Sequence, residues 1–184
     1  MPHLIRIDDP DDERLDLFHR NERALMNRAQ KRTDGSGMFL AEGDLVVERA
    51  LDAGCVPVAA LVDADRVPGV AARFTDVPVY AGGDALRARV TGMGVPQPVI
   101  AVFERPRRRE VGELVATATR LVLLEAVDNP ANVGSVVRNA AALGWDGLVL
   151  DGTSADPLAR RALRVSMGHA IAFPHARSRE LAPL

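Results

Sequence analysis

One stretch of the chain constrains its fold more than any other: the apolar run RLVLLEAV at residues 120–127, which is followed by DNPAN and then by VGSVVRNAAALG. The run is apolar at consecutive positions, which is typical of a central strand in a parallel sheet with both faces covered. The segment after the turn has helical spacing and ends at Gly144, a residue suited to a helix C-terminus. Residues 120–144 therefore predict a strand–loop–helix unit, the repeating unit of α/β domains.

The same pattern continues towards the end of the chain. WDGLVLDG, at residues 145–152, predicts a second strand. Asp156-Pro157 then predicts the start of a helix, with Asp as N-cap and Pro at the first helical position, that runs to about residue 166. MGHAIAFP, at residues 167–174, predicts a third strand. We expect residues 119–184 to form an α/β domain.

The first part of the chain also alternates between strand and helix patterns. We expect a helix over residues 11–32, and a turn at DGSG. Strands are expected at 38–43, 58–62, 77–81 and 99–103, with helices at 44–53 and 83–90. Residues 1–104 thus predict a small α/β domain. Residues 105–118 change composition and predict a linker with a short helix. We favour solvent exposure for the arginines of this segment over contact with RNA phosphates. These arginines are Arg105, Arg107, Arg108 and Arg109.

Composition excludes several classes of protein. The single cysteine, Cys55, allows no internal disulfide or cysteine cluster, and the four histidines lack the paired spacing of a zinc site, so we expect no metal. No apolar run approaches the ~20 residues of a membrane span, and no signal peptide is visible, so we expect a cytoplasmic protein. The net charge of −2 predicts no strong field for a polyanion. All basic residues but Lys31 are arginines, the better phosphate ligands, although a GC-rich genome explains most of this bias.

The loop DNPAN follows a predicted parallel strand, and ligands of such sheets bind beyond the carboxyl ends of the strands. The loop lacks the glycines of a dinucleotide fold and the lysine of a P-loop. We expect Asn132 to cap the next helix, and Gly134 to admit another backbone or a ligand. Arg138, nearly two turns along, is placed to reach a phosphate or ribose. Spacing alone slightly favours a simpler interpretation, a capped helix with a surface arginine.

The pattern N-x-x-N-x-G-x-x-x-R-x-A resembles motif one of the SpoU/TrmH RNA ribose methyltransferases of the SPOUT superfamily. The matching residues are Asn129, Asn132, Gly134, Arg138 and Ala140. DPLARRALRVSMGHAIAFP resembles the family's next helix and strand, with His169 inserted before the expected small residue. FLAEGDLVVERAL, VPVYAGGDAL and TGMGVPQPVIAVFERP resemble its substrate-binding domain, where Pro98 stands in place of a common glycine.

This resemblance implies a fold and an activity. The fold would be α/β, with an N-terminal ribosomal-protein-like substrate-binding domain followed by the first part of a Rossmann-like SPOUT (trefoil-knot) methyltransferase domain. The activity would be transfer of a methyl group from S-adenosylmethionine to a ribose 2′-hydroxyl of tRNA or rRNA. The resemblance also implies a homodimer that acts on RNA.

The resemblance assigns roles to individual residues. Arg138 would stabilise the developing alkoxide and orient the neighbouring phosphate, and Asn132 would shape the site, so both are expected to be catalytic. Substrate-binding residues would be Asn129, Gly134, Arg160, Arg161 and Arg164. For the last three, a solvated basic face is the alternative that we slightly favour. Gly168 is expected to serve a tight turn.

The family's second and third motifs, which supply the cofactor pocket, the knot and much of the dimer interface, lie beyond the last residue of this sequence. We therefore expect a fragment of a longer protein, with no cofactor-binding residue in these 184 residues. A chain that truly ends at Leu184 would instead be a non-catalytic RNA-binding module. A small-molecule α/β enzyme is a weaker third reading, because neither a nucleotide loop nor a general base is apparent.

Overall fold

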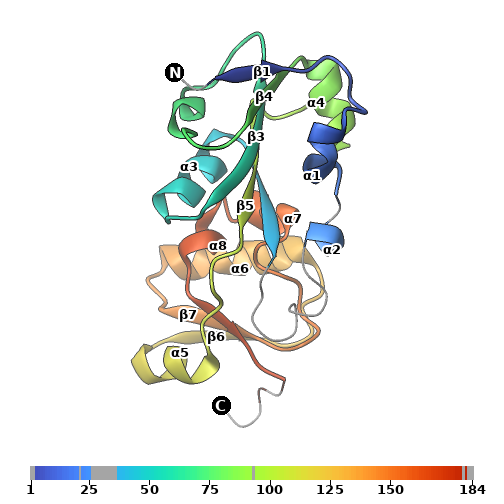
Figure 1. Cartoon of the computed structure of the whole chain (residues 1–184). Helices are drawn as coiled ribbons and strands as arrows, with labels where there is room; N and C mark the ends of the chain where they lie inside the picture. Colours follow the sequence, from blue (N-terminus) through green and yellow to red (C-terminus); the bar gives the residue numbers. More distant parts are fainter. Residues whose placement is uncertain (1–2, 21, 26–36, 93, 180, 182–184) are drawn as a thin grey trace. The chain divides into compact units, whose positions relative to one another are not determined.

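The computed structural model describes residues 3–20, 22–25, 37–92, 94–179 and 181. The chain divides into two compact units, Met1–Arg105 and Pro106–Leu184, which we call the first and the second unit. Each unit is a mixed α/β structure built on its own sheet (Figure 1).

The first unit is built on a five-stranded sheet with the order β1-β4-β3-β5-β2. β1, β4 and β3 are parallel, whereas β5 runs antiparallel to both of its neighbours, β3 and β2. Side chains of successive residues point to opposite faces of a strand, so each buried strand supplies two layers of core. The strands are β1 (Leu4–Arg6), β2 (Met38–Glu42), β3 (Pro57–Asp63), β4 (Val79–Gly82) and β5 (Val99–Glu104).

Helices cover both faces of this sheet (Figure 1). On one face, Leu40 and Ile100 belong to a core cluster that includes Phe18 and Leu86 from the covering helices. On the other face, the ring of Phe103 lies 5.5 Å from that of Phe39. The first face is covered by α1 (Asp16–His19) and α4 (Asp84–Thr91), and the second by α3 (Asp44–Asp52) and the 3₁₀ helix η2 (Gly69–Arg73).

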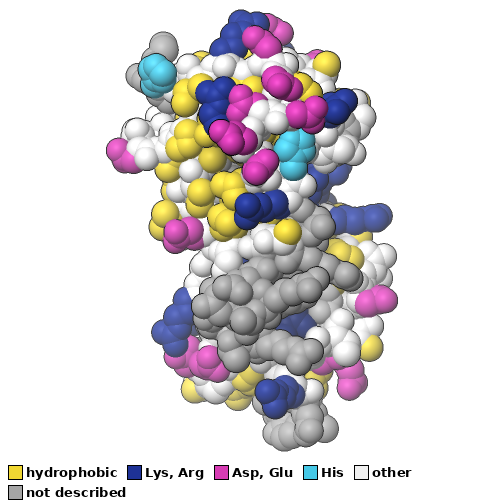
Figure 2. Space-filling view, turned by 45° about the vertical axis from the view of Figure 1, so that its right-hand side comes forward, with side chains coloured by type: hydrophobic (Ala, Val, Ile, Leu, Met, Phe, Trp, Pro, Cys, Tyr) yellow, Lys and Arg dark blue, Asp and Glu magenta, His cyan; other side chains and the backbone are white. Residues whose placement is uncertain are grey.

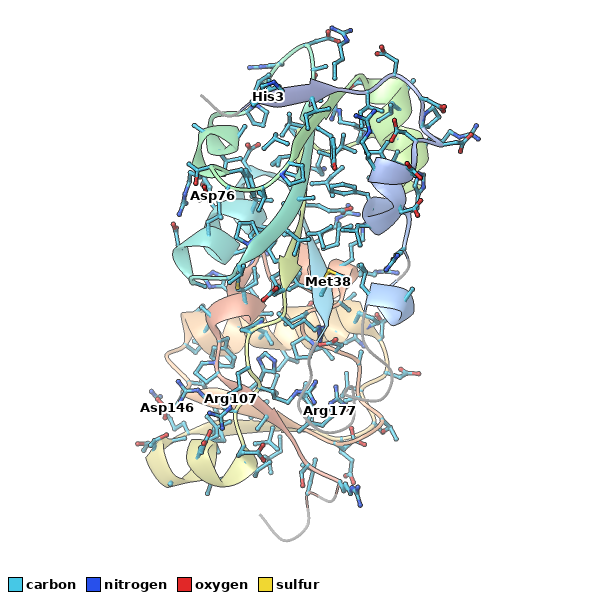
Figure 3. The ribbon with its side chains drawn as sticks, viewed as in Figure 1. His3, Met38, Asp76, Arg107, Asp146 and Arg177 are labelled. Carbon is cyan, nitrogen blue, oxygen red and sulfur yellow. The ribbon has the colours of Figure 1, made fainter. Side chains whose placement is uncertain are left out.

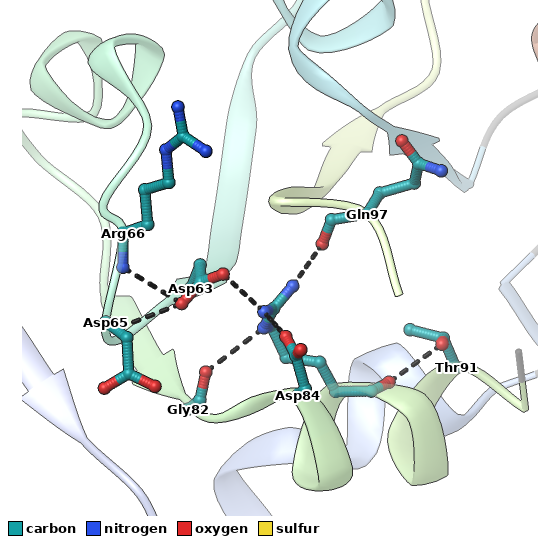
Figure 4. Close-up of polar contacts among 8 residues, drawn as sticks. Asp63, Asp65, Arg66, Gly82, Asp84, Thr91 and Gln97 are labelled. Carbon is teal, nitrogen blue, oxygen red and sulfur yellow. Dashed lines mark hydrogen bonds and ion pairs between the residues drawn. The ribbon is translucent and has the colours of Figure 1, made fainter. Parts of the chain in front are cut away.

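A buried arginine ties the carboxyl ends of two of these strands together (Figure 4). Arg87 of α4 is only 1% exposed. Its Nε donates to the Gly82 carbonyl at 3.1 Å, and its Nη1 donates to the Gln97 carbonyl at 2.6 Å. Its Nη2 donates to the carboxylate of Asp63 at 2.7 Å and also to that of Asp84. Arg87 thus fixes the ends of β3 and β4, the start of α4 and the loop that enters β5.

The second unit contains three parallel strands in the order β6-β7-β8. α6 connects the first two strands, and α7 and α8 connect the last two. These three helices pack against one another, while α5 packs on the opposite face, where Leu114 meets Val149 and Ala176 (Figure 1). The strands are β6 (Leu121–Leu124), β7 (Gly147–Leu150) and β8 (His175–Arg177); the helices are α5 (Val111–Thr117), α6 (Pro130–Ala142), α7 (Arg160–Val165) and α8 (His169–Ala172).

Most of the elements expected after residue 37 are confirmed within a few residues. The expected helix over residues 11–32 is wrong in its described part. A 3₁₀ turn, η1 (Glu13–Leu15), leads into α1, which ends at His19, and Arg20 is extended before the short α2 (Glu22–Leu25). The extended backbone of Arg20, with a ψ of 132°, ends α1, and Leu15 and Phe18 are buried in the core. β1 was not expected. Residues 21 and 26–36, including most of the expected DGSG turn, lie outside the described residues.

Three expectations for the second unit are also wrong. β6 is not a central strand with both faces covered, because it lies at the edge of the described three-stranded sheet and its Leu123 is 50% exposed. Residues 167–174 form a turn and α8, and the third strand is β8, just beyond them. Met167 and Gly168 both have left-handed backbones, with φ of 53° and 82°, which a strand cannot contain. α7 begins at Arg160 with Ala159 as its N-cap, because Asp156 caps a preceding turn through the N–H of Leu158 at 3.0 Å.

The segment expected to be a linker, residues 105–118, contains the predicted short helix, α5. Leu114 of this helix is buried in the core of the second unit. The boundary between the two units along the chain lies between Arg105 and Pro106. Residues 106–118 therefore belong to the second unit and contribute to its packing.

Candidate functional site

The loop after β6 sets where α6 begins. The side-chain oxygen of Asn129 accepts a hydrogen bond from the N–H of Ala131 at 2.9 Å, and Pro130 occupies the first helical position. Proline suits this position because its φ is already helical and the missing N–H is not needed there. The expectation that Asn132 caps the helix is therefore wrong. Asn129 is the cap, and Asn132 lies in the first turn with its side chain exposed.

The two residues expected to be catalytic lie on the exposed side of α6. The helix buries Val133, Val137 and Ala140 and leaves Asn132 and Arg138 exposed. Six residues of α-helix separate these two by about 120° around the helix axis. A ligand that contacts both side chains must therefore lie across the exposed face of α6, not along a single narrow stripe.

Gly134 is the closest point between α6 and α7. A Cβ atom on Gly134 would lie 2.5 Å from the carbonyl oxygen and 3.0 Å from the Cα of Ala162. Sequence reasoning expected either a backbone or a ligand to approach here, and the structure places a backbone. Gly134 is buried in this contact, so we remove it from the substrate-binding group and assign it to helix packing.

The exposed face of α7 carries arginines. Ala162 and Leu163 are buried, whereas Arg161 and Arg164 are exposed one turn apart on the same face. Arg160 is partly buried, which separates it from the other two. Gly134 and Ala162 thus bring a helix with an exposed Arg138 against a helix with two exposed arginines.

Formal charge differs between the two units. The second unit has 10 basic and 8 acidic residues, whereas the first has 13 basic and 17 acidic residues. Figure 2 shows acidic side chains gathered on a face of the first unit. Because arginines attract the phosphates of nucleic acids, the second unit is the better placed to hold a polyanion.

A tight turn ends α7 just after Arg164. Gly168 has a φ of 82°, and its N–H donates to the carbonyl of Leu163 at 2.8 Å. Ser166 is fully buried, and its hydroxyl donates to the same carbonyl at 3.2 Å. The expectation that Gly168 serves a turn is confirmed.

The loops that follow β6 and β7 are joined at the carboxyl edge of the second sheet. The N–H of Ala155 donates to the carbonyl of Val127 at 2.8 Å, and the N–H of Val127 donates to the hydroxyl of Ser154 at 3.1 Å. Hydrogen bonds from Ser154 and Thr153 hold the pKa of Asp151 well below its usual range. Sequence reasoning missed Ser154 and also Arg177, which binds the same loop; the D-x-x-S spacing from Asp151 was the available signal for this turn.

Two other kinds of site are not found in the part of the chain that the structure describes. No group of three or more His, Cys, Asp or Glu side chains there is arranged to hold a metal ion. No helix among those residues is long and apolar enough to cross a membrane.

The second unit is similar to a known protein family. Residues 119–183 match the model of the SpoU rRNA Methylase family. The matched residues lie within the second unit. The matched range begins just before β6 and includes all of the candidate residues on α6 and α7.

Curated relatives extend the similarity over the first unit. An uncharacterised tRNA/rRNA methyltransferase of Mycobacterium bovis is 39% identical over 181 residues, which covers 92% of this chain and 59% of the relative. The 23S rRNA (guanosine(2553)-2'-O)-methyltransferase RlmP of Bacillus subtilis is 32% identical over 149 residues, covering 80% of this chain and 57% of the relative. The chain thus spans somewhat more than half the length of these relatives.

Solved structures show the same fold. The crystal structure of an AdoMet-bound rRNA methyltransferase from Sinorhizobium meliloti matches with a TM-score of 0.75 and 26% identity. The match covers 95% of this chain and 64% of that one. The mixed α/β fold of this chain therefore matches the fold of the corresponding part of the Sinorhizobium meliloti protein.

Proposed function

We propose that this protein transfers a methyl group from S-adenosylmethionine to a ribose 2′-hydroxyl of tRNA or rRNA. The observation that carries the proposal is the exposed Arg138 on a helix that starts at the carboxyl edge of the second sheet, within a segment that matches the SpoU family. The names of the relatives support the same chemistry, since RlmP is a ribose 2′-O-methyltransferase of rRNA.

Arg138 is proposed to act on the attacking hydroxyl. A ribose hydroxyl is a poor nucleophile until its proton is removed or polarised. A guanidinium placed beside it stabilises the negative charge that develops on the oxygen, and its planar fork binds the neighbouring phosphate at the same time. The exposed side chain of Arg138 has the reach and the charge for this role.

Other residues of the second unit are proposed to hold the RNA. Arg161 and Arg164 extend the positive surface from α6 onto α7, and their spacing suits successive phosphates of a backbone. Arg160 is a weaker candidate because it is partly buried. Asn132 is proposed to shape the site from the first turn of α6, and Asn129 acts there chiefly as the helix cap.

The hydrogen-bonding side chains of Ser154 and Arg177 at the carboxyl edge are engaged within the protein, so we do not propose that they bind the cofactor. The Ser154 hydroxyl is engaged with Val127 and with the carbonyl of Leu124, and Arg177 is engaged with carbonyls of the loop after β7. These groups hold the loops together, and we assign no contact with S-adenosylmethionine to them. The cofactor would supply the electrophilic methyl group, while the described residues bind the RNA and activate its hydroxyl.

Two broader features complete the proposal. The first unit would serve as the substrate-binding domain, and the second as the first part of a knotted SPOUT domain. The active protein would be a homodimer. Sedimentation analysis of the product of the complete gene tests the dimer, and a monomer that retains full turnover would contradict it.

The test of the proposed function is a transfer assay with the product of the complete gene. Total RNA from a strain without the gene is incubated with the protein and S-adenosylmethionine carrying a labelled methyl group. We expect label in RNA at a ribose, revealed by one phosphodiester bond that resists alkaline hydrolysis. RNA binding without transfer would instead support a non-catalytic RNA-binding module, and label on a base would contradict ribose methylation.

A further inference from the structure

We propose that Ser154 and Arg177 are positioning residues that hold the loop at residues 125–129 in the shape needed for methyl transfer. The inference rests on the proposed function and deepens it, because this loop leads directly into the cap of α6. Neither residue is part of the pattern shared with motif one.

Ser154 bridges the loop after β6 from within the loop after β7. Its side chain is 5% exposed. The hydroxyl accepts a hydrogen bond from the N–H of Val127 at 3.1 Å and donates to the carbonyl of Leu124 at 3.3 Å. The two backbone groups flank residues 125–126, so one hydroxyl fixes both ends of this short segment.

Between these two anchors the backbone is strained. Ala126 has a φ of 54°, in the left-handed region that residues other than glycine, asparagine and aspartate rarely adopt. Such a conformation persists only where the surrounding contacts determine it, and it is found most often at functional sites. The bonds made by Ser154, together with that from the Ala155 N–H to the Val127 carbonyl at 2.8 Å, are such contacts.

Arg177 holds Ser154 in place from the end of β8, where Figure 3 labels it. Its Nη1 donates to the carbonyl of Ser154 at 2.9 Å and to that of Asp151, and its Nη2 donates to the carbonyl of Ala155 at 3.3 Å. A guanidinium is the side chain that can serve three carbonyls from one position. Arg177 thereby connects the third strand of the sheet to the loop that carries Ser154.

The chain of contacts reaches the proposed catalytic arginine through the backbone. Val127 lies two residues before Asn129, the cap of α6, and Arg138 lies on that helix. A displaced loop would displace the start of α6, and misplacement by about 1 Å can lower a reaction rate about a hundredfold. Because Ser154 is buried, it makes no contact with RNA, so its removal should affect turnover more than RNA binding.

The first experiment replaces Ser154 by Ala and, separately, by Thr in the product of the complete gene. We expect Ser154→Ala to lower kcat for methyl transfer at least tenfold, with KM for RNA changed less than threefold, as estimated for a misplaced catalytic group. Ser154→Thr retains the hydroxyl and should recover most of the loss. Equal kcat values for wild type and Ser154→Ala would overturn the positioning role.

A second experiment does not depend on whether threonine fits. Arg177→Met should lower kcat in the same way as Ser154→Ala. The matched control is Arg120→Met, because Arg120 also donates to a carbonyl, that of Gly144, beside Asp146 at the opposite end of the sheet. Figure 3 labels Asp146 and Arg177 at these two ends. Equal losses in kcat for the two arginine variants would overturn the proposal, because general weakening of the sheet would then explain both.

Amide hydrogen exchange of the 184-residue chain separates this inference from the proposed function. In Ser154→Ala and Arg177→Met, the N–H groups of Val127 and Ala155 should exchange at least tenfold faster, while amides of α3 in the first unit stay unchanged. Unchanged exchange at Val127 would overturn the inference whatever the activity. A wild-type protein that binds RNA but transfers no methyl group would overturn the proposed function and the catalytic part of this inference, and exchange would still decide whether the loop is held.

Discussion

Gly134 of α6 and Ala162 of α7 approach so closely that no side chain fits between them: a Cβ atom on Gly134 would lie 2.5 Å from the carbonyl oxygen of Ala162. The contact sets the position of α7 relative to α6. It therefore also sets where the exposed arginines of α7 lie relative to Arg138.

Replacing Gly134 by Ala should destabilise the second unit. Alanine favours a helix by about 1 kcal/mol over glycine, but the added methyl group meets backbone atoms that cannot rotate away. Overpacking of this kind costs about 1–3 kcal/mol, so we expect a net loss of stability in chemical denaturation. The control is Gly112→Ala in α5, where an added Cβ meets nothing within 4 Å and stability should stay equal or rise. Equal stabilities for the two variants would contradict the assigned contact.

We expect the loss of Arg87 to destabilise the first unit as much as the loss of an apolar core residue. Arg87→Met removes four hydrogen bonds, to groups at the ends of β3 and β4, at the start of α4 and in the loop before β5, and leaves Asp63 without its cation. Breaking a buried ion pair costs about 3–5 kcal/mol, and we expect about 3 kcal/mol because both carboxylates keep some access to water.

The matched control for this variant is Arg89→Met on the same helix. Arg89 forms an exposed ion pair with Asp11, at 3.4 Å, and such pairs contribute less than about 1 kcal/mol. Denaturant titration should therefore separate the two variants clearly. Similar losses would show that the buried network contributes no more than a surface pair.

Arg87 and Arg177 have roles that the sequence alone does not predict. The apolar run before DNPAN predicted the strand β6 and the helix α6 after it, but not that β6 lies at the edge of the described sheet with Leu123 half exposed. No comparable sequence pattern marks Arg87 or Arg177. An arginine that binds carbonyls inside a unit has the same sequence signature as one on a solvated helix face, so only the fold distinguishes them.

The candidate site was predicted in outline and wrong in two details. Asn132 was expected to be the cap because it precedes the apolar stretch of the helix, but Pro130 moves the start of the helix back to Asn129. MGHAIAFP has the composition of a strand, and only the left-handed backbones of Met167 and Gly168 turn it into α8. The first difference follows from a proline, and the second from backbone geometry; side-chain periodicity reports neither.

Stability of the first unit should fall at acidic pH through Asp63. Burial, the largest single influence, raises the pKa of Asp63, but hydrogen bonds from the N–H groups of Asp65 and Arg66 and the charge of Arg87 together hold it below the ordinary value of an aspartate. A carboxyl with a lowered pKa in the folded state stabilises that state above its unfolded pKa and loses this contribution as pH falls.

We therefore expect the free energy of unfolding to decrease as pH drops below about 4. Asp63→Asn should flatten this part of the profile, measured by denaturant titration at a series of pH values. Arg89→Met should keep the wild-type slope, since Arg89 takes no part in the network. A slope that is unchanged in Asp63→Asn would assign the acid sensitivity to other carboxylates.

Arg164→Ala should weaken RNA binding and make it less sensitive to salt. Each phosphate contact that is lost reduces the slope of log K against log salt by about 0.7–0.9, because fewer counterions are released on binding. Filter binding at several salt concentrations measures the slope. Arg73→Ala is the control, since Arg73 is paired with Asp52 in the first unit at 2.8 Å and should leave the slope unchanged. An unchanged slope in Arg164→Ala would remove Arg164 from the phosphate contacts.

Arg138→Ala should abolish most methyl transfer while RNA binding is largely retained. Removal of one donor that stabilises a developing oxyanion lowers kcat by about 10²–10³-fold, whereas one lost phosphate contact among several weakens binding only modestly. Arg138→Lys keeps the charge but not the planar fork, so it should restore only part of the activity. Ser135→Ala, at an exposed position on the same helix, should behave as wild type. If Arg138→Ala instead weakens RNA binding and leaves kcat at the wild-type value, the exposed arginine of α6 holds the RNA backbone and the hydroxyl is activated elsewhere.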